Sequence, residues 1–126
     1  MIIGIGTDLC EIGRVQRALD RHGERFARKI LIGSELDRFR QHRKPAVYLA
    51  KRFAAKEAFS KAMGTGIHFP VNWHNVSVEN AHSGRPMLQF SAPLEVLLRS
   101  RGVTATHLSL TDEIGMACAF VVLEGG

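Results

Sequence analysis

The stretch KRFAAKEAFSKA, residues 51–62, has the composition and spacing of an α-helix, and the rest of the chain is best understood from it. With about 100° between successive residues, one helical face carries only small side chains, those of Ala54, Ala55, Ala58 and Ala62. Three polar residues are expected to face away from this arc: Arg52, Lys56 and Ser60. The alanine face predicts that another backbone or a flat ligand approaches the helix closely.

Glu57, at the border of the alanine face, has two interpretations. It precedes Lys61 by four residues, and an exposed pair with this spacing stabilises a helix by about 0.2–0.5 kcal/mol. Alternatively, Glu57 holds a cation, because Mg²⁺ is usually bound by one or two carboxylates together with substrate phosphate oxygens. Asp8 is the candidate for a second carboxylate. Asp8 also has a simpler interpretation as a helix N-cap, because Glu11 follows it at the spacing of a capping box.

The segments on the two sides of this helix differ in character. Before it, the pattern predicts a strand at residues 2–5, a helix between 8 and 23, a short helix at 24–32, and a further helix from 34. The central helix should run from Pro45 to Met63. After it, the pattern predicts a β-hairpin within 76–90, a helix at 93–101 and two final strands. The last strand, residues 116–123, is almost continuously apolar and should be central in its sheet. The expected fold class is α+β, with helices mainly in the first half and antiparallel strands in the second, as a single domain over residues 1–126.

The amino-acid composition indicates the class of protein and the kind of molecule that it binds. A hydrophobic fraction of 45% with 23% charged residues is typical of a globular protein. The net charge of +5 and the pI near 9.8 favour an anionic partner. Cys10 and Cys118 form no CxxC motif, so neither a disulfide framework nor a structural zinc site is indicated.

Targeting signals are not evident in the sequence. The opening run MIIGIG, residues 1–6, lacks a basic leader, and no segment approaches the ~20 apolar residues of a membrane span. We therefore expect a cytoplasmic protein that does not contact a membrane.

Four motifs, in this order and spacing, carry a resemblance to a known family. They are IGTDLCEIGRV (5–15), LAKRFAAKEAFSKAMGTGI (49–67), SGRP (83–86) and HLSLTDEIGMACAFVVLE (107–124). Together they span nearly the whole chain, and FAAKEAFSKA followed by GTGI is the most specific of them. The chain resembles the holo-acyl-carrier-protein synthases, the short type of 4'-phosphopantetheinyl transferase.

The resemblance implies an activity and a site. Such enzymes transfer the 4'-phosphopantetheine group of coenzyme A to a serine of apo acyl carrier protein and release adenosine 3',5'-bisphosphate. By their match to the family motifs, Asp8 and Glu57 would be Mg²⁺ ligands, and Lys61 would act beside the reacting phosphate. The remaining matched residues would contact coenzyme A: Ser60 and Gly64 at the end of the helix, and Pro86 next to the nucleotide. Either Glu57 or a metal-bound water would take the proton of the serine.

The resemblance also implies two kinds of protein contact. Family members are generally homotrimers with active sites at the subunit interfaces. Acyl carrier proteins are acidic, and one helical face carries a basic stripe that could meet them: Arg14, Arg17 and Arg21. The family supports Arg14 most directly, whereas a solvated helix face is an equal alternative for the other two.

Three positions depart from the family pattern or have no role in it. The hairpin turn contains Arg85 where many relatives have lysine, and a planar guanidinium binds phosphate with different geometry. Asp112 stands where some relatives have histidine, and a carboxylate cannot donate to a phosphate at neutral pH, so we do not carry a nucleotide contact over to it. His107 is expected to be a packed or hydrogen-bonded strand residue rather than a base.

Two alternatives belong to other functional classes. A small RNA-binding protein would fit the basic pI, but the chain has neither an aromatic strand pair of the RNP type nor a GxxG clamp, and no nucleic-acid partner is expected. A noncatalytic module that binds an acidic carrier would keep the basic stripe without needing Asp8, Glu57 and Lys61 together. Metal-dependent turnover separates such a module from the enzyme.

Overall fold

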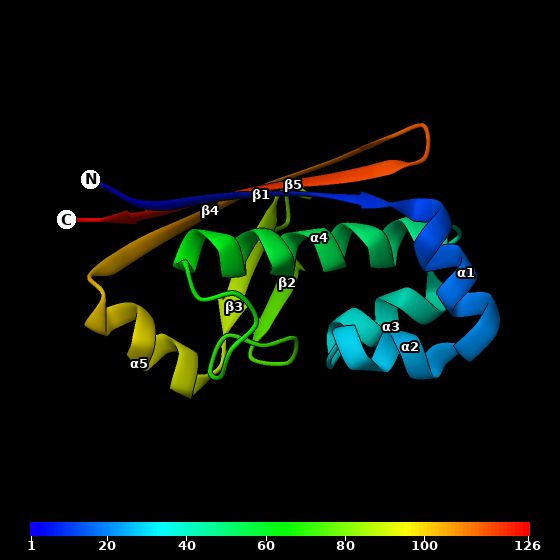
Figure 1. Ribbon diagram of the computed structural model, residues 1–126, viewed down its shortest axis with the longest axis horizontal. Helices are drawn as coiled ribbons and strands as arrows, with labels where there is room; N and C mark the ends of the chain where they lie inside the picture. Colours follow the sequence, from blue (N-terminus) through cyan, green and yellow to red (C-terminus); the bar gives the residue numbers. More distant parts are fainter.

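The long helix lies against one face of a three-stranded antiparallel sheet. In the computed structural model, which describes residues 1–126, helix α4 spans Pro45–Met63 and runs beneath the sheet (Figure 1). The strands are β1 (Ile2–Glu11), β4 (Val103–Glu113) and β5 (Met116–Gly125), in the order β1-β5-β4. The predicted bounds of α4 and the central place of the last strand are confirmed.

The alanine face of α4 receives the backbone of β1. A Cβ atom at Gly6 would clash with the carbonyl oxygen of Ala58, and one at Gly4 would clash with that of Ala62. Because neither glycine has a side chain, strand and helix approach at backbone distance. The sequence left open whether another backbone or a flat ligand packs against the alanine face, and in the structure it is the backbone of β1.

Three helices gather at one end of α4 (Figure 1). They are α1 (Ile12–His22), α2 (Glu24–Ile30) and α3 (Ser34–Gln41), close to the predicted ranges. The predicted capping box is wrong, because β1 continues through Asp8 to Glu11 and no side chain caps α1. Pairing with β5, in which Asp8 lies opposite Ala119, keeps these residues extended. Asp8 is therefore a strand residue and not an N-cap.

The second half supplies a hairpin and a short helix. Strands β2 (Val76–Asn80) and β3 (Pro86–Phe90) pair antiparallel, and α5 (Ala92–Ser100) leads from them to β4. The hairpin packs against α4 and β4, whereas β1 is at the opposite edge of the sheet. The hairpin and the short helix therefore appear as predicted, and the fold class is α+β.

The polar side chains that face away from the alanine arc are also buried. Arg52 is 6% exposed, Lys56 0% and Ser60 1%. The α2–α3 segment and the hairpin cover this side of α4, so the helix is enclosed on both faces. This burial could not be predicted from the local pattern, because charged residues are almost never fully buried unless they are paired.

The outer face of the sheet is uncovered. All the helices lie on one side of the sheet (Figure 1), and apolar side chains point outward on the other: Ile5, Leu9, Met116 and Phe120. His107 bonds through Nε2 to Glu124 at 2.9 Å, which confirms that it is a hydrogen-bonded strand residue. The outer face of the sheet thus leaves several large apolar side chains exposed to solvent.

None of the helices is both long enough and apolar enough to cross a lipid bilayer.

Candidate active site

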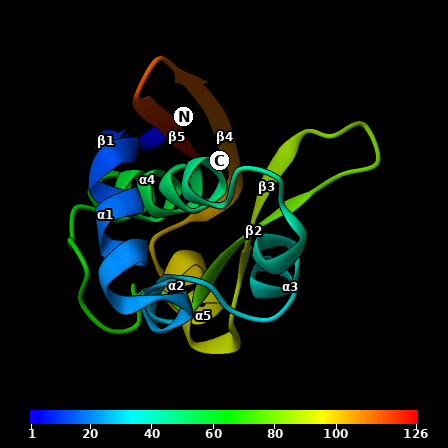
Figure 2. The ribbon, with the colours of Figure 1, turned by 90° about the vertical axis from the view of Figure 1, so that its right-hand side faces the viewer.

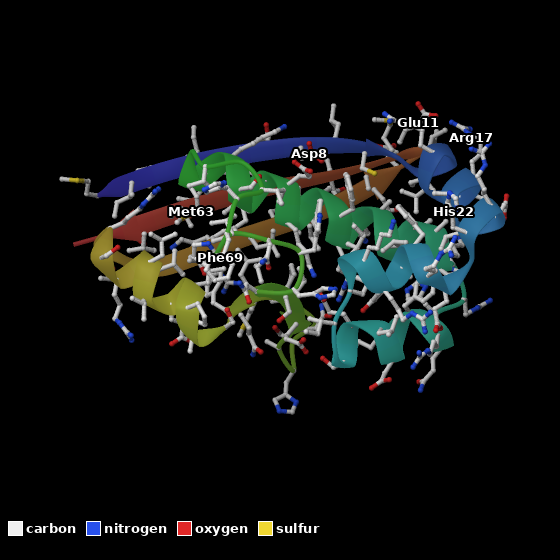
Figure 3. All side chains as sticks on the ribbon, turned by 60° about the horizontal axis from the view of Figure 1, so that its bottom comes forward. Asp8, Glu11, Arg17, His22, Met63 and Phe69 are labelled. Carbon is white, nitrogen blue, oxygen red and sulfur yellow. The ribbon has the colours of Figure 1, made fainter.

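Asp8 and Lys61 meet where β1 crosses the last turns of α4. Lys61 donates from Nζ to Oδ1 of Asp8 at 3.1 Å and to the carbonyl oxygen of Thr7 at 3.0 Å. The Asp8 side chain is 15% exposed and that of Lys61 is 53% exposed. Figure 3 shows Asp8 on β1 with its carboxylate on the side of the helix. Residues 53 positions apart in the chain therefore form one polar cluster.

Glu57 lies one turn before Lys61 and completes the cluster. Burial raises the pKa of the Glu57 carboxyl, the charge of Asp8 raises it further, and Lys61 lowers it. The carboxylate has no hydrogen-bond or ion-pair partner, because Lys61 bonds to Asp8 instead. The interpretation of Glu57 and Lys61 as an i,i+4 ion pair is therefore wrong, and Glu57 keeps both oxygens free.

The two carboxylates suit a magnesium ion that takes some of its ligands from the protein and the others from a substrate. No group of three or more histidine, cysteine or acidic side chains is assembled anywhere in the molecule, so a site made by protein ligands alone is absent. Mg²⁺ usually takes only one or two carboxylates and completes its octahedron with water and phosphate oxygens. Asp8 and Glu57 fit that requirement, since both acids face one partly exposed region and one of them is unpartnered.

The end of α4 is formed by Ser60 and Gly64. Ser60 is buried, and its hydroxyl donates to the carbonyl oxygen of Glu57 at 2.7 Å. Gly64 is exposed and ends the helix in the left-handed region with φ 74°, a conformation that glycine adopts without strain. Gly64 is therefore the more accessible of the two predicted coenzyme contacts.

Pro86 lies on the other side of α4 from the acidic cluster. It begins β3 and lines a recess of about 370 Å³ between the hairpin and β4. The other side chains of this recess include Arg85, Met87, Leu88, Thr106 and Leu108. Figure 2 shows the hairpin and β1 on opposite sides of α4. The structure thus unites Asp8, Glu57 and Lys61 but does not bring Pro86 to them within one chain.

The basic stripe borders an apolar groove. Arg14 lines a recess of about 340 Å³ whose walls include Val15, Phe26 and Phe53. Arg14, Arg17 and Arg21 are all exposed. Arg17 pairs with Glu11 at 3.3 Å at the junction of β1 and α1 (Figure 3), so its charge is partly compensated. The charges were predicted from the sequence but the groove beside them was not, because Phe26 and Phe53 come from separate helices.

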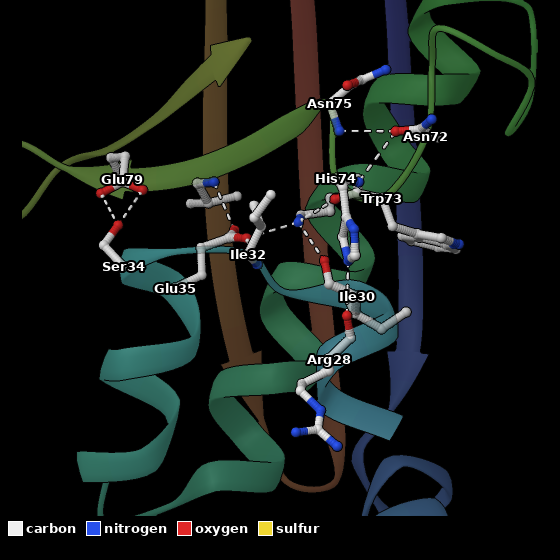
Figure 4. A network of polar contacts seen from close by, with 12 residues as sticks. Arg28, Ile30, Ile32, Ser34, Glu35, Asn72, Trp73, His74, Asn75 and Glu79 are labelled. Atoms are coloured by element: carbon white, nitrogen blue, oxygen red, sulfur yellow. Dashed lines mark hydrogen bonds and ion pairs between the residues drawn. The ribbon is translucent and has the colours of Figure 1, made fainter. Parts of the chain in front are cut away.

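A buried network that the sequence analysis missed holds the inner side of α4 (Figure 4). Lys56 donates from Nζ to Glu35 Oε1 at 2.8 Å and to the carbonyl oxygens of Ile30 and Trp73 at 2.5 and 2.7 Å. Glu35 also accepts from the backbone amides of Ile32 and Val78. Glu35 and Lys56 are both fully buried.

Asp112 also has a partner within the chain. It forms an ion pair with Lys51 at 2.7 Å.

Comparison with known proteins agrees with these observations. Residues 4–118 match the 4'-phosphopantetheinyl transferase superfamily. The holo-[acyl-carrier-protein] synthase of Nitrosomonas europaea is 51% identical over 124 residues, covering 98% of this chain and 99% of that protein. That of Aromatoleum aromaticum is 53% identical over 124 residues, with 98% of each chain covered.

Solved structures are similar throughout. The crystal structure of the holo-[acyl-carrier-protein] synthase from Neisseria meningitidis has a TM-score of 0.94 at 44% identity, covering 98% of this chain and 99% of that one. The enzyme from Bacillus anthracis, in complex with CoA (3',5'-ADP), has a TM-score of 0.84 at 35% identity, covering 100% of this chain and 99% of that one. The expected 4'-phosphopantetheinyl transferase fold is confirmed.

Proposed function

Because the chain belongs to the 4'-phosphopantetheinyl transferase superfamily, we propose that Asp8, Glu57 and Lys61 form the reaction centre of its activity. That activity is the transfer of the 4'-phosphopantetheine group of coenzyme A to a serine of apo acyl carrier protein, which yields holo acyl carrier protein and adenosine 3',5'-bisphosphate. The protein is thus a transferase, and residues 1–126 act as one domain. The observation that carries the residue assignment is the unpartnered Glu57 carboxylate beside the Asp8–Lys61 pair.

Asp8 and Glu57 hold Mg²⁺ in this proposal. When bound, the ion supplies a Lewis acid beside the pyrophosphate and offsets the charge that develops on the leaving oxygen. Asp8 lies on a paired strand and Glu57 on a packed helix, so both carboxylates extend from rigid backbone positions before the substrate arrives. Fixed charges of this kind act strongly because they need no reorganisation during the reaction.

Lys61 and the end of α4 bind coenzyme A. Lys61 is long and half exposed, so its ammonium reaches a phosphate next to Asp8. Ser60 and Gly64 border the coenzyme at the last turn, where Gly64 lets the ligand approach the backbone. The nucleotide lies against Pro86 in the recess between the hairpin and β4.

The site is completed by a neighbouring chain in a homotrimer. The acidic cluster is on β1 and the Pro86 recess is beside β4, and these strands are the two edges of the sheet. A neighbour that places its β4 edge beside β1 would unite them. The outer face of the sheet supports such an assembly, since Ile5 is 61% exposed, Leu9 66% and Phe120 42%.

The carrier protein docks on α1. Arg14, Arg17 and Arg21 offer positive charge to an acidic helix, and the groove at Val15, Phe26 and Phe53 accepts its apolar side chains. This surface leads along β1 toward Asp8, so a docked carrier would present its serine near the reaction centre. We place the reaction in the cytoplasm, where a reducing environment keeps Cys10 and Cys118 free.

Intact-mass spectrometry of an apo acyl carrier protein tests the proposal. The carrier is incubated with coenzyme A and the enzyme, either with Mg²⁺ or with EDTA. Wild type with Mg²⁺ should add about 340 Da, and EDTA should prevent the gain. Glu57→Gln should slow the gain by about 10²–10³-fold if the carboxylate holds the metal. The matched control is Glu95→Gln, which removes an exposed carboxylate from α5 and should leave the gain unchanged. Equal turnover by Glu57→Gln and wild type would overturn the assignment of Glu57.

A further inference from the structure

The Asp8–Lys61 pair occupies the position at which a cation is needed. The ammonium of Lys61 is 3.1 Å from Oδ1 of Asp8, so it covers lone pairs that a metal ion would use. A second bond, to the carbonyl oxygen of Thr7, holds it there. With the substrate absent, Asp8 already has a counter-ion, and that counter-ion is a side chain of the protein.

Lys61 pairs with Asp8 and not with the glutamate that is nearest to it on its own helix. Glu57 is four residues before Lys61 on the same helix, the spacing at which a glutamate and a lysine normally pair. Lys61 instead crosses to β1, and Glu57 is left without a partner. The cluster therefore has two carboxylates and one ammonium, and it keeps a net negative charge with one acid covered and the other open.

Lys61 is free to leave this position. Its side chain is 53% exposed, and its ammonium bonds only to Asp8 and to the carbonyl oxygen of Thr7. Lys56, five residues earlier on the same helix, is instead fully buried and bonds to three acceptors. A lysine stem has four flexible carbons, so the ammonium can move several ångströms without any change in the backbone.

We infer that Lys61 is an exchangeable counter-ion of Asp8: it opposes metal binding in the free enzyme and moves to the pyrophosphate when coenzyme A binds, so that metal and coenzyme A bind cooperatively. The inference rests on the proposed function, since it takes Asp8 and Glu57 as the metal ligands. In addition to binding phosphate, Lys61 then lowers the affinity of the site for the metal ion when no substrate is present. The physical cause is that two cations cannot share the Asp8 carboxylate without strong mutual repulsion.

Binding of Mn²⁺, followed by the electron paramagnetic resonance signal of the free ion, tests the inference without measuring turnover. Lys61→Met keeps the length of the side chain and removes its charge. In the absence of coenzyme A it should bind Mn²⁺ roughly tenfold more tightly than wild type. Lys51→Met is the matched control, because Lys51 is another ion-paired lysine of α4, and its removal should leave the dissociation constant within twofold.

Coenzyme A provides the second arm of the test. In wild type it should tighten Mn²⁺ binding by two effects, the added phosphate ligands and the departure of Lys61 from Asp8. In Lys61→Met only the first effect remains, so the enhancement should be several-fold smaller. Thermal melting of each variant checks that the fold is intact.

The outcomes separate the inference from the proposed function. If Glu57→Gln loses Mn²⁺ binding while Lys61→Met and wild type bind equally, the metal site stands and the counter-ion role of Lys61 is overturned. If neither wild type nor Lys61→Met binds Mn²⁺ with or without coenzyme A, both are overturned. Tighter binding by Lys61→Met together with a smaller effect of coenzyme A supports the inference.

Discussion

Lys56 and Lys61, five residues apart on α4, form two ion pairs of opposite character. Lys56 and Glu35 are fully buried, and each oxygen of Glu35 has at least one donor. Lys61 and Asp8 lie at the surface, and Glu57 beside them has no partner. The first network is closed and can only hold the fold together. The second has unused bonding capacity and can accept a ligand.

A structural charge in this protein has all its hydrogen-bonding capacity used, whereas a functional charge has some left free. The Lys56–Glu35 network joins the segment after α2, the start of α3, the loop at Trp73 and strand β2 to α4. A ligand would have to break these bonds in order to bind. At Glu57, by contrast, a ligand replaces water and leaves the fold unchanged, and we therefore place the chemistry there.

The largest expected effect comes from breaking the closed network. Lys56→Met leaves the Glu35 carboxylate buried without its partner and should lower the free energy of unfolding by about 3–5 kcal/mol. Urea denaturation followed by circular dichroism measures the change. The double variant Glu35→Leu with Lys56→Met should recover part of the loss, because no uncompensated charge remains, although the backbone amides of Ile32 and Val78 lose their acceptor. A loss below about 1 kcal/mol in the single variant would mean that the network is not structural.

The open cluster should show the reverse behaviour. Glu57→Gln should lower turnover by about 10²–10³-fold, since removal of one well-placed electrostatic stabiliser costs ~3–4 kcal/mol in the barrier. Its unfolding midpoint should stay equal to or slightly above that of wild type, because the Glu57 charge is held near Asp8 without a partner. Steady-state kinetics and thermal melting on the same preparation test both halves. Unfolding of Glu57→Gln would erase the distinction between the two regions.

Arg14→Ala should have a smaller effect, confined to the carrier protein. Loss of one exposed positive charge should raise the KM for the carrier about fivefold and leave the KM for coenzyme A unchanged. The difference should shrink at high salt, because exposed charges are then screened. Arg99→Ala, which removes an exposed arginine from α5, is the control. An unchanged carrier KM in Arg14→Ala would remove the docking role of the stripe.

The smallest effect is expected from a pair that is neither enclosed nor functional. Arg40 bonds to Glu24 through Nε at 2.7 Å and lowers the pKa of that carboxyl below its ordinary value of 4.5. A lowered pKa in the folded state means that the pair contributes stability above pH 4.5 and loses it as the pH falls through the folded pKa. Thermal melts of Arg40→Ala and wild type should therefore differ slightly at pH 7 and converge in acid. A constant difference at every pH would show that Arg40 acts through packing alone.

Helices and strands could be predicted from the sequence where local propensity and end signals decide them. Helix α4 was predicted because its alanines, its proline at the start and its glycine at the end agree with one another, and β5 because its apolar run suits a central strand. The Asp8–Glu11 spacing misled because sheet pairing overrode a local capping pattern.

Long-range pairs could not be predicted in the same way. Nothing in the local pattern links Glu35 to Lys56, 21 residues away, or Lys61 to Asp8, 53 residues away. Such partners are fixed by the packing of whole elements. The acidic pair itself was found because the residue types needed for metal chemistry are few, whereas its geometry and the free state of Glu57 required the structure.

The most direct test of the account is the position of a bound metal ion. Crystals grown with Mn²⁺ and coenzyme A can be measured at a wavelength where manganese scatters anomalously. We expect a peak in contact with the carboxylates of both Asp8 and Glu57, with the ammonium of Lys61 turned away from Asp8 toward the pyrophosphate. A peak at any other place, or an ion that leaves Glu57 untouched while the enzyme is active, would contradict it.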